Sequence, residues 1–133
     1  MKYMLDTNIV VFAKNNMPEV VLERLSRLEL GEMCISSMAL AELEYGVFNS
    51  SDPNSNQMAL VLFLSCIDIV PFDDNAAIEY GRIRADLKRK GTPIGANDLL
   101  IAAHAKSLGL TLVTHNTREF ARVEGLDLED WAE

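Results

Sequence analysis

Short runs of Leu, Ile and Val that alternate with helix-like segments constrain the fold of this 133-residue chain more than any other feature. These runs predict strands at residues 2–6, 33–35, 67–72 and 110–114. The intervening segments predict helices that start at Ile9 and that cover 19–28, 38–48, 58–65, 75–90 and 98–108. Apolar strands that alternate with helices favour βα units and a parallel sheet covered on both faces. The sequence therefore predicts an α/β fold.

Helix start and stop residues support these boundaries. Pro18 fits the first turn of the 19–28 helix, Ser36 or Ser37 fits the cap of the 38–48 helix, and Gly109 fits the end of the last helix. The polar residues 49–57 (NSSDPNSNQ) predict a loop. Because there is no internal repeat or linker, we expect a single domain over residues 1–133.

Composition excludes several classes of protein. Apolar residues make up 49% and charged residues 24%, so disorder is not expected. No apolar run approaches the ~20 residues needed to cross a bilayer, and an acid at position 6 interrupts any signal-peptide core. We therefore expect a cytoplasmic protein without a membrane segment. Cys34 and Cys66, which lack metal-site spacing, are expected to be small buried hydrophobes.

The net charge of −8 is unusual for a protein that binds nucleic acid. One segment departs from it, because residues 82–90 hold five basic side chains and one acid. The basic residues are Arg82, Arg84, Lys88, Arg89 and Lys90. Two interpretations stay open: a solvated helix face, or a rim that faces phosphates.

Asp6 ends the first predicted strand and is followed by Thr7 and Asn8. In open α/β sheets, ligands bind in the crevice at the carboxyl ends of the strands. Asp, Thr and Asn are also good helix caps, so capping is the alternative explanation for this segment. A binding site requires further polar residues at equivalent places.

Two other polar groups are expected at the same edge. Thr114, His115 and Asn116 follow the fourth predicted strand. Asn97 and Asp98 open the most apolar predicted helix, where Asp98 could be a cap alone. His104 is about 240° around that helix from Asp98, so we expect it to have a structural role.

Glu42 is harder to explain as a structural residue. Its helix is apolar nearly all round, so we expect it to be mostly buried, and no basic residue lies one turn away. A buried acid without a partner is costly unless it binds a metal or its pKa rises. Glu44 has a similar setting, so helical geometry does not choose between the two.

Several oxygen ligands at one point suit a hard cation such as Mg²⁺ or Mn²⁺. A metal held by carboxylates polarises a phosphoryl oxygen and activates water. A bound metal also reconciles the negative net charge with RNA binding, because divalent ions neutralise an acidic pocket that would otherwise repel RNA.

Four blocks of this sequence, in order along the whole chain, resemble the PIN-domain ribonucleases of the VapC toxin type. The blocks are residues 3–8 (YMLDTN), 35–46 (ISSMALAELEYG), 93–105 (PIGANDLLIAAHA) and 112–120 (LVTHNTREF). The resemblance implies a three-layer α/β/α sandwich with a central parallel sheet of about four to five strands. It also implies a magnesium-dependent endoribonuclease that is the toxin of a type II toxin–antitoxin system.

The resemblance assigns roles to particular residues. It favours Glu42 over Glu44, and implies that Asp6, Glu42 and Asp98 are the metal ligands and act in catalysis with Asn116. Many PIN domains have an acid at the position of Asn116, which leaves the number of metals open and makes Glu119 either a partial substitute or a surface acid. The residues expected to contact substrate are Thr7, Asn8, Thr114, His115, Arg84, Lys88 and Arg89.

The resemblance further implies an RNA substrate, with the anticodon loop of tRNA as the leading candidate. A VapB-like antitoxin is the expected partner, with the 20–28 and 38–48 helices as candidate docking surfaces, and the toxin is expected to form a homodimer. Alternatives are a PIN-domain nuclease that processes RNA without being a toxin, and an inactive binding module. A receiver domain would need a Lys near Thr114, and this chain has none there. A haloacid-dehalogenase phosphatase would need an acid at the position of Asn8.

Overall fold

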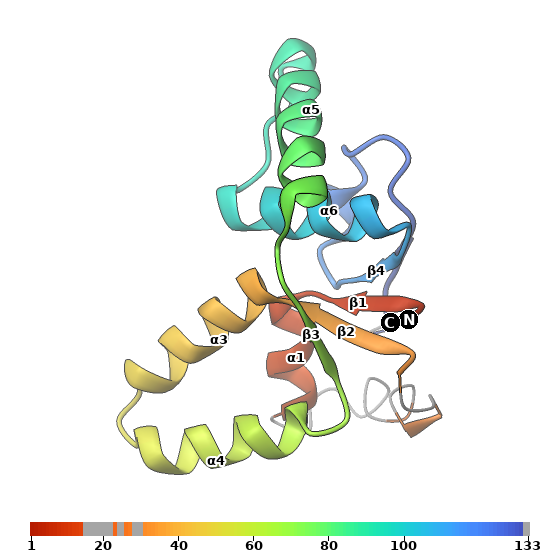
Figure 1. Ribbon diagram of the computed structural model, residues 1–133. Helices are drawn as coiled ribbons and strands as arrows, with labels where there is room; N and C mark the ends of the chain where they lie inside the picture. The colour runs from red at the N-terminus through yellow and green to blue at the C-terminus, as the bar shows by residue number, and fades with distance from the viewer. Residues whose placement is uncertain (15–22, 24–25, 28–30, 132–133) are drawn as a thin grey trace.

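The computed structural model describes residues 1–14, 23, 26–27 and 31–131 (Figure 1). Apart from three isolated residues, the helix expected at 19–28 lies outside the described part of the chain. The same holds for the docking surface expected at 20–28.

A five-stranded parallel sheet forms the centre, in the order β3-β2-β1-β4-β5. The strands are β1 (Tyr3–Leu5), β2 (Met33–Ser36), β3 (Asp68–Val70), β4 (Thr111–Val113) and β5 (Leu128–Glu129). The four predicted strands are confirmed, and β5 was missed. β5 is only two residues long, and its pairing with β4 (Leu112 with Leu128) is a long-range contact that gives no periodic pattern.

Helices cover both faces of the sheet, which confirms the three-layer arrangement (Figure 1). They are α1 (Thr7–Lys14), α3 (Ser37–Phe48), α4 (Pro53–Leu64), α5 (Asp74–Lys90), α6 (Ala96–Leu108) and the short α7 (Thr117–Phe120). α6 lies over one face with α5 packed outside it, while α1 and α4 lie on the other side. Within the described residues, no helix combines the length and apolar character needed to cross a membrane.

The predicted loop at 49–57 is wrong over its second half, because α4 begins at Pro53. Asp52 is the N-cap, and its carboxylate accepts a hydrogen bond from the Ser55 amide at 3.3 Å. Pro53 occupies the first helical turn, where its missing N–H costs nothing. The polar residues that predicted a loop are therefore the cap and first turn of a helix.

α6 begins at Ala96, two residues earlier than predicted, with Gly95 as its N-cap. Asp98 therefore lies in the first turn and is not the cap. The predicted end is confirmed: Gly109 closes the helix at φ 67°, a left-handed conformation that favours glycine.

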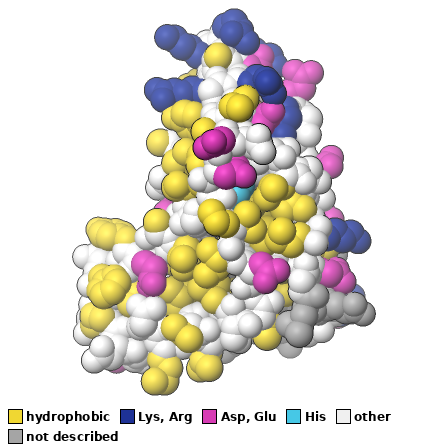
Figure 2. Space-filling view, viewed as in Figure 1, with side chains coloured by type: hydrophobic (Ala, Val, Ile, Leu, Met, Phe, Trp, Pro, Cys, Tyr) yellow, Lys and Arg dark blue, Asp and Glu magenta, His cyan; other side chains and the backbone are white. Residues whose placement is uncertain are grey.

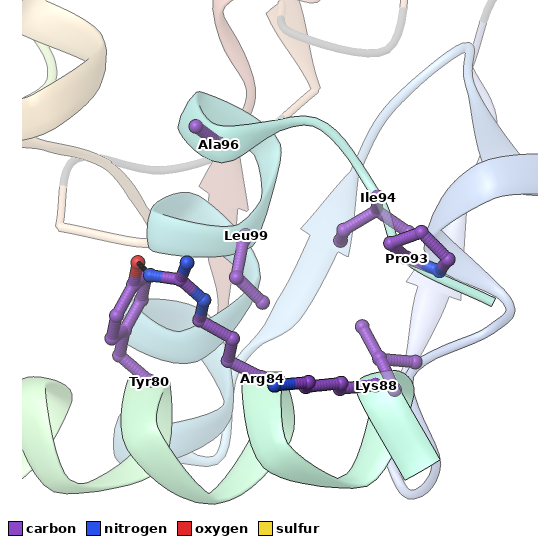
Figure 3. Close-up of a pocket in the computed structure, with 8 residues that line it drawn as sticks. Tyr80, Arg84, Lys88, Pro93, Ile94, Ala96 and Leu99 are labelled. Atoms are coloured by element: carbon purple, nitrogen blue, oxygen red, sulfur yellow. Dashed lines mark hydrogen bonds between the residues drawn. The ribbon is translucent and has the colours of Figure 1, made fainter. Parts of the chain in front are cut away.

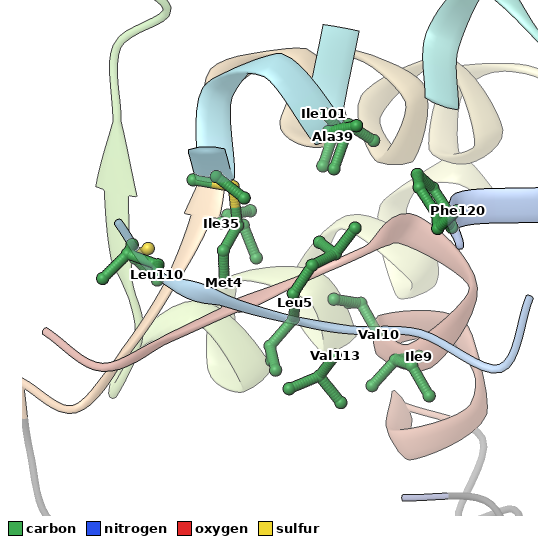
Figure 4. Packing of buried hydrophobic residues seen from close by; sticks show 14 of the residues in the cluster. Met4, Leu5, Ile9, Val10, Ile35, Ala39, Ile101, Leu110, Val113 and Phe120 are labelled. Carbon is green, nitrogen blue, oxygen red and sulfur yellow. The ribbon is translucent and has the colours of Figure 1, made fainter. Parts of the chain in front are cut away.

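The core lies between the sheet and its helices (Figure 4). Buried side chains from β1, α1, β2, α6 and β4 meet there, among them Met4, Leu5, Ile35, Ile101 and Leu112. His104 is also buried: its Nδ1 lies 2.8 Å from the Ser36 hydroxyl, and its ring packs edge-on against Phe72. His104 therefore has a structural environment, as expected.

Two predictions about burial are wrong. Cys34 is buried, and burial raises the pKa of its thiol to about 11, but Cys66 is exposed. α3 is not buried all round, because only Ala39, Leu43 and Val47 are buried along it. Its outer apolar side chains face solvent because no described element covers them, which composition alone does not reveal.

Candidate active site at the carboxyl edge of the sheet

The order of the strands places the site. The chain runs from β1 to β2 on one side, whereas β4 pairs with β1 on the other, so the sheet changes winding direction beside β1. Such a switch point opens a crevice at the carboxyl ends of the strands. Asp6 directly follows β1 and Thr114 directly follows β4.

The buried carboxylate of Asp6 has two partners. Its Oδ1 accepts a hydrogen bond from the Ile9 amide at 2.9 Å, which caps α1, and its Oδ2 accepts one from the Thr114 hydroxyl at 2.6 Å. The pKa of Asp6 is nevertheless raised, chiefly by burial, against the lowering effect of these hydrogen bonds. Capping and membership of an acidic site, treated as alternatives in the sequence, thus coexist in one side chain.

Glu42 joins α3 to the same site. Its Oε1 accepts from the Thr7 hydroxyl at 2.9 Å, and its Oε2 accepts from the Asn97 side chain at 3.2 Å. Glu44, two residues along the helix, instead lies 3.5 Å from Gln57 of α4. The two acids therefore occupy different faces of α3, and Glu42 is the one beside Asp6.

Asp98 lies among other acids. Its pKa is raised to about 6, first by burial and then by the negative charges of Glu119, Asp6 and Glu42. A hydrogen bond between the carboxyl groups of Asp98 and Glu119 adds to this. Four carboxyl groups from three helices and the end of β1 therefore act on one another electrostatically.

Glu119 belongs to the site and is not an isolated surface acid. The Gly95 amide donates to its Oε1 at 2.7 Å, and the Asn116 side chain donates to its Oε2 at 2.8 Å. These two hydrogen bonds, in that order, are the main reason that the pKa of Glu119 is lowered. The side chain of Asn116 thus orients the carboxylate of Glu119.

Of the remaining predicted residues at this edge, Thr114 links two strand ends, whereas Asn8 and His115 are exposed. The Thr114 hydroxyl, which donates to Asp6, accepts from the Asn116 amide at 2.9 Å and so links the ends of β4 and β1. Asn8 is exposed beside Asp6. His115 is exposed, with its Nδ1 3.1 Å from Asp130.

The donor set fits a hard divalent cation by its chemistry: four carboxylates and two amides, all oxygen ligands, with an excess of negative charge. In residues 1–14, 23, 26–27 and 31–131, no three His, Cys, Asp or Glu side chains form a ready metal cluster. Protein donors engage both carboxylate oxygens of Asp6, Glu42 and Glu119. A bound cation would therefore compete with Thr7, Asn97, Thr114 and other donors for these oxygens.

The predicted basic rim divides between two faces of α5. Arg84 and Lys88 line a hollow that also includes Ala96 and Leu99 on either side of Asp98. Arg89 instead lines a second hollow with Asp86 and Lys106. Figure 2 shows Lys and Arg gathered at the far end of α5, above the rest of the molecule. Of the three predicted residues, Arg84 and Lys88 thus share a hollow with the first turns of α6, and Arg89 does not.

Two groups that contact the acidic cluster were not among the predicted site residues. Asn97, noted only as a neighbour of Asp98, contacts Glu42, and the Gly95 amide holds Glu119. A carbon added to Gly95 would lie 3.6 Å from Glu119 and 3.7 Å from Asp98, so this residue is packed directly against the carboxylates. The position of both in the first turn of the helix that carries Asp98 is the pattern that could have identified them.

Comparisons with known proteins agree with this fold. Residues 3–126 match the PIN domain family. The chain is 50% identical over 132 residues, 99% of each chain, to the tRNA(fMet)-specific endonuclease VapC of Shigella flexneri. It is 46% identical over 132 residues, 98% of each chain, to the ribonuclease VapC2 of Rickettsia felis.

A solved structure shows the same architecture. It contains VapBC2 of Rickettsia felis bound to a DNA fragment from its promoter. The match has a TM-score of 0.93 and 45% identity, and it covers 98% of this chain and 99% of that chain. The chain therefore belongs to the PIN-domain family and, within it, to the VapC ribonucleases, as the resemblance predicted.

Proposed function

We propose that this protein is a divalent-metal-dependent endoribonuclease that acts as the toxin of a type II toxin–antitoxin pair. The main observation behind the proposal is that the carboxylates of four acids interact electrostatically at the switch point of the sheet. These acids are Asp6, Glu42, Asp98 and Glu119. Mutually repelling carboxylates destabilise a fold, so an inactive binding module would gain nothing from such a cluster.

Asp6, Glu42 and Asp98 would hold Mg²⁺ or Mn²⁺, with Glu119 as a fourth acid and Asn116 as its positioning partner. The bound cation would supply charge stabilisation at the scissile phosphate and lower the pKa of water. Asn97 and Thr7 keep Glu42 oriented toward the site, and Thr114 keeps Asp6 in place. Partly buried Thr7 and exposed Asn8 and His115 are proposed to contact RNA.

We propose tRNA as the substrate, because the Shigella flexneri relative is named a tRNA(fMet)-specific endonuclease and the likeness covers nearly the whole chain. The anticodon loop is the proposed cleavage site, since enzymes reach single-stranded loops more easily than paired stems. The cytoplasm, where tRNA is found, is the proposed location.

Incubation of the purified protein with tRNA(fMet) and with total cellular RNA, followed by mapping of new ends, tests this function. Cleavage should require Mg²⁺ or Mn²⁺ and stop in EDTA. Glu42→Gln should abolish it, whereas Glu44→Gln, a matched change two residues away on α3, should leave it intact. Cleavage that persists in excess EDTA, or equal loss in both variants, would contradict the proposed site.

We also propose a VapB-like antitoxin as partner, in keeping with the VapB protein in the Rickettsia felis complex. The surface that favours this is the apolar face of α3 and α4, here called the α3–α4 face. It consists of Tyr45, Phe48, Met58, Val61 and Leu62, each 58–73% exposed. Figure 2 shows hydrophobic side chains gathered over this part of the molecule. An exposed apolar patch with helical spacing suits a partner helix.

A homodimer is proposed from the family resemblance alone, and light scattering of the isolated protein would measure it.

Toxicity is tested in cells: expression alone should slow growth, and co-expression with the gene product encoded beside it should restore growth. If wild type and Asp6→Asn leave growth and cellular RNA equally untouched, the toxin function fails even though the PIN fold stands.

A further inference from the structure

The basic side chains of α5 are of two kinds. Arg82 pairs with Glu79, Arg89 lies 4.0 Å from Asp86, and Lys90 lies 3.0 Å from Asp86 and 3.3 Å from Glu124. Arg84 and Lys88 take part in no salt bridge within the described residues. Two cations on this helix are thus left without a carboxylate partner in the described structure.

Arg84 and Lys88 lie four residues apart and line the same hollow between α5 and α6, which has a volume of about 440 Å³ (Figure 3). Like charges at this spacing repel each other along a helix. Arg84 is also held in place, because its guanidinium donates to the Tyr80 hydroxyl at 2.8 Å and lies 5.9 Å from the centre of that ring. An anionic ligand would offset the repulsion and meet an ordered guanidinium.

The opposite wall of the hollow is apolar. Pro93, Ile94 and Leu99 form it, facing Arg84 and Lys88 across the space (Figure 3). The volume lies within the range of small-molecule sites. A nucleotide combines a flat base, which packs on apolar and aromatic side chains, with a phosphate that prefers Arg and Lys. The two walls match these two parts.

The hollow and the acidic site share one segment of chain. Ile94 and Ala96 line the hollow, while the Gly95 amide between them donates to Glu119. Asp98 lies between Ala96 and Leu99 on the same first turns of α6. The same short segment of chain therefore borders both the hollow and the acidic site.

We propose that this hollow is a subsite for one nucleotide of the RNA substrate, adjacent to the bond that is cut. Its base packs against Ile94, Leu99 and Pro93, and its phosphate binds Arg84 and Lys88. The subsite thus contributes both affinity and a preference for the nucleotide beside the cut. This inference rests on the proposed ribonuclease function and adds a place where the enzyme recognises sequence.

The first test measures binding by the full-length protein in EDTA, so that the acidic site without metal repels phosphate. The probes are the four nucleoside 5′-monophosphates, with ribose 5-phosphate and inorganic phosphate as probes that lack a base. At least one nucleotide should bind about tenfold more tightly than ribose 5-phosphate, with NMR shifts at Ile94 and Leu99. Equal binding of all probes would show charge attraction only and would overturn the subsite.

Two double variants with the same loss of charge separate the subsite from general electrostatics. Arg84→Gln with Lys88→Gln should weaken nucleotide binding about tenfold or more, whereas Arg82→Gln with Lys90→Gln on the same helix should not. Ile94→Ala should weaken nucleotide binding and leave ribose 5-phosphate unaffected. Equal effects of the two double variants would overturn the assignment of the phosphate.

The second test uses RNA with randomised nucleotides around the cut. The Arg84/Lys88 double variant should raise KM about tenfold, flatten the preference at a position beside the cut, and change kcat less than about twofold. An unchanged KM and preference would overturn the subsite while leaving the ribonuclease function intact. If the wild type cleaves no RNA, the proposed function fails, and the nucleotide-binding result then decides the subsite separately.

Discussion

Asp6 holds two structural hydrogen bonds and also belongs to the acidic site, and two substitutions separate these roles. Asp6→Asn keeps an oxygen that can cap α1 and removes one of the repelling charges, so the metal-free protein should be as stable as wild type or more so. Asp6→Ala loses the cap and leaves Thr114 without its acceptor, and should cost about 1–3 kcal/mol. Both should abolish cleavage.

Urea unfolding in EDTA measures these free energies. If Asp6→Asn destabilised the protein as much as Asp6→Ala, the carboxylate charge itself would be required by the fold, and the acidic-site assignment would lose its main support.

The raised pKa of Asp98 predicts how the stability of the metal-free protein depends on pH. Its pKa is about 6 in the folded state and near 3.8 when unfolded, so between these values the folded state holds more protons. Stability should therefore fall as pH rises from about 4 to about 6, by on the order of 1–2 kcal/mol. Asp6, whose pKa is also raised, contributes with the same sign. The lowered pKa of Glu119 acts in the opposite direction, but only below its ordinary value of 4.5.

Unfolding curves in EDTA between pH 4.5 and 7 check this sign. Asp98→Asn should flatten the slope, while Asp127→Asn, a change at an exposed acid, should retain it. Stability that rises with pH over this window in the wild type would contradict the crowding of carboxylates.

At the scale of elements, α3 and α4 form a hairpin with an inner face in the core and the outer α3–α4 face in solvent. Tyr45→Ser combined with Phe48→Ser should weaken binding of the antitoxin by about 100-fold, because large apolar anchors dominate such interfaces. The melting temperature should change little, since both side chains are more than two-thirds exposed.

Ile78→Ser on α5 is the matched control, since Ile78 is also an exposed apolar residue, at 58%, but lies outside this face. Calorimetric titration with the antitoxin distinguishes the variants. Unchanged affinity in the Tyr45/Phe48 variant would place the antitoxin elsewhere on the toxin.

For the whole molecule, the net charge of −8 and the carboxylate cluster predict stabilisation by divalent cations. At a magnesium concentration about 100 times the dissociation constant, the gain is about 2.7 kcal/mol, or a rise in Tm of roughly 5–10 °C. Glu42→Gln should reduce this rise, and NaCl at equal ionic strength should not reproduce it, because screening acts on all surface charges. Equal rises with NaCl and MgCl₂ in thermal melts would argue against a specific site.

The sequence by itself determined the parallel α/β class, the four main strands and the helix end at Gly109. Each depends on interactions within a few residues, such as periodic apolar side chains and the conformational freedom of glycine. The same local chemistry was insufficient where one residue type serves two purposes. Asp52 and Pro53 are common both in loops and at helix starts, and only the structure shows that Asp52 caps α4, whose Leu60 packs in the core.

The candidate site shows the same division. Chain order alone put Asp6 and Thr114 at strand ends, because the carboxyl ends of parallel strands share one edge. The tertiary structure decided that Glu42 and not Glu44 joins them, and that Arg84 and Lys88 line one hollow with α6 while Arg89 lines another. The physical reason is that helical spacing fixes which residues share a face, whereas the face turned toward the sheet depends on contacts between elements far apart in the chain.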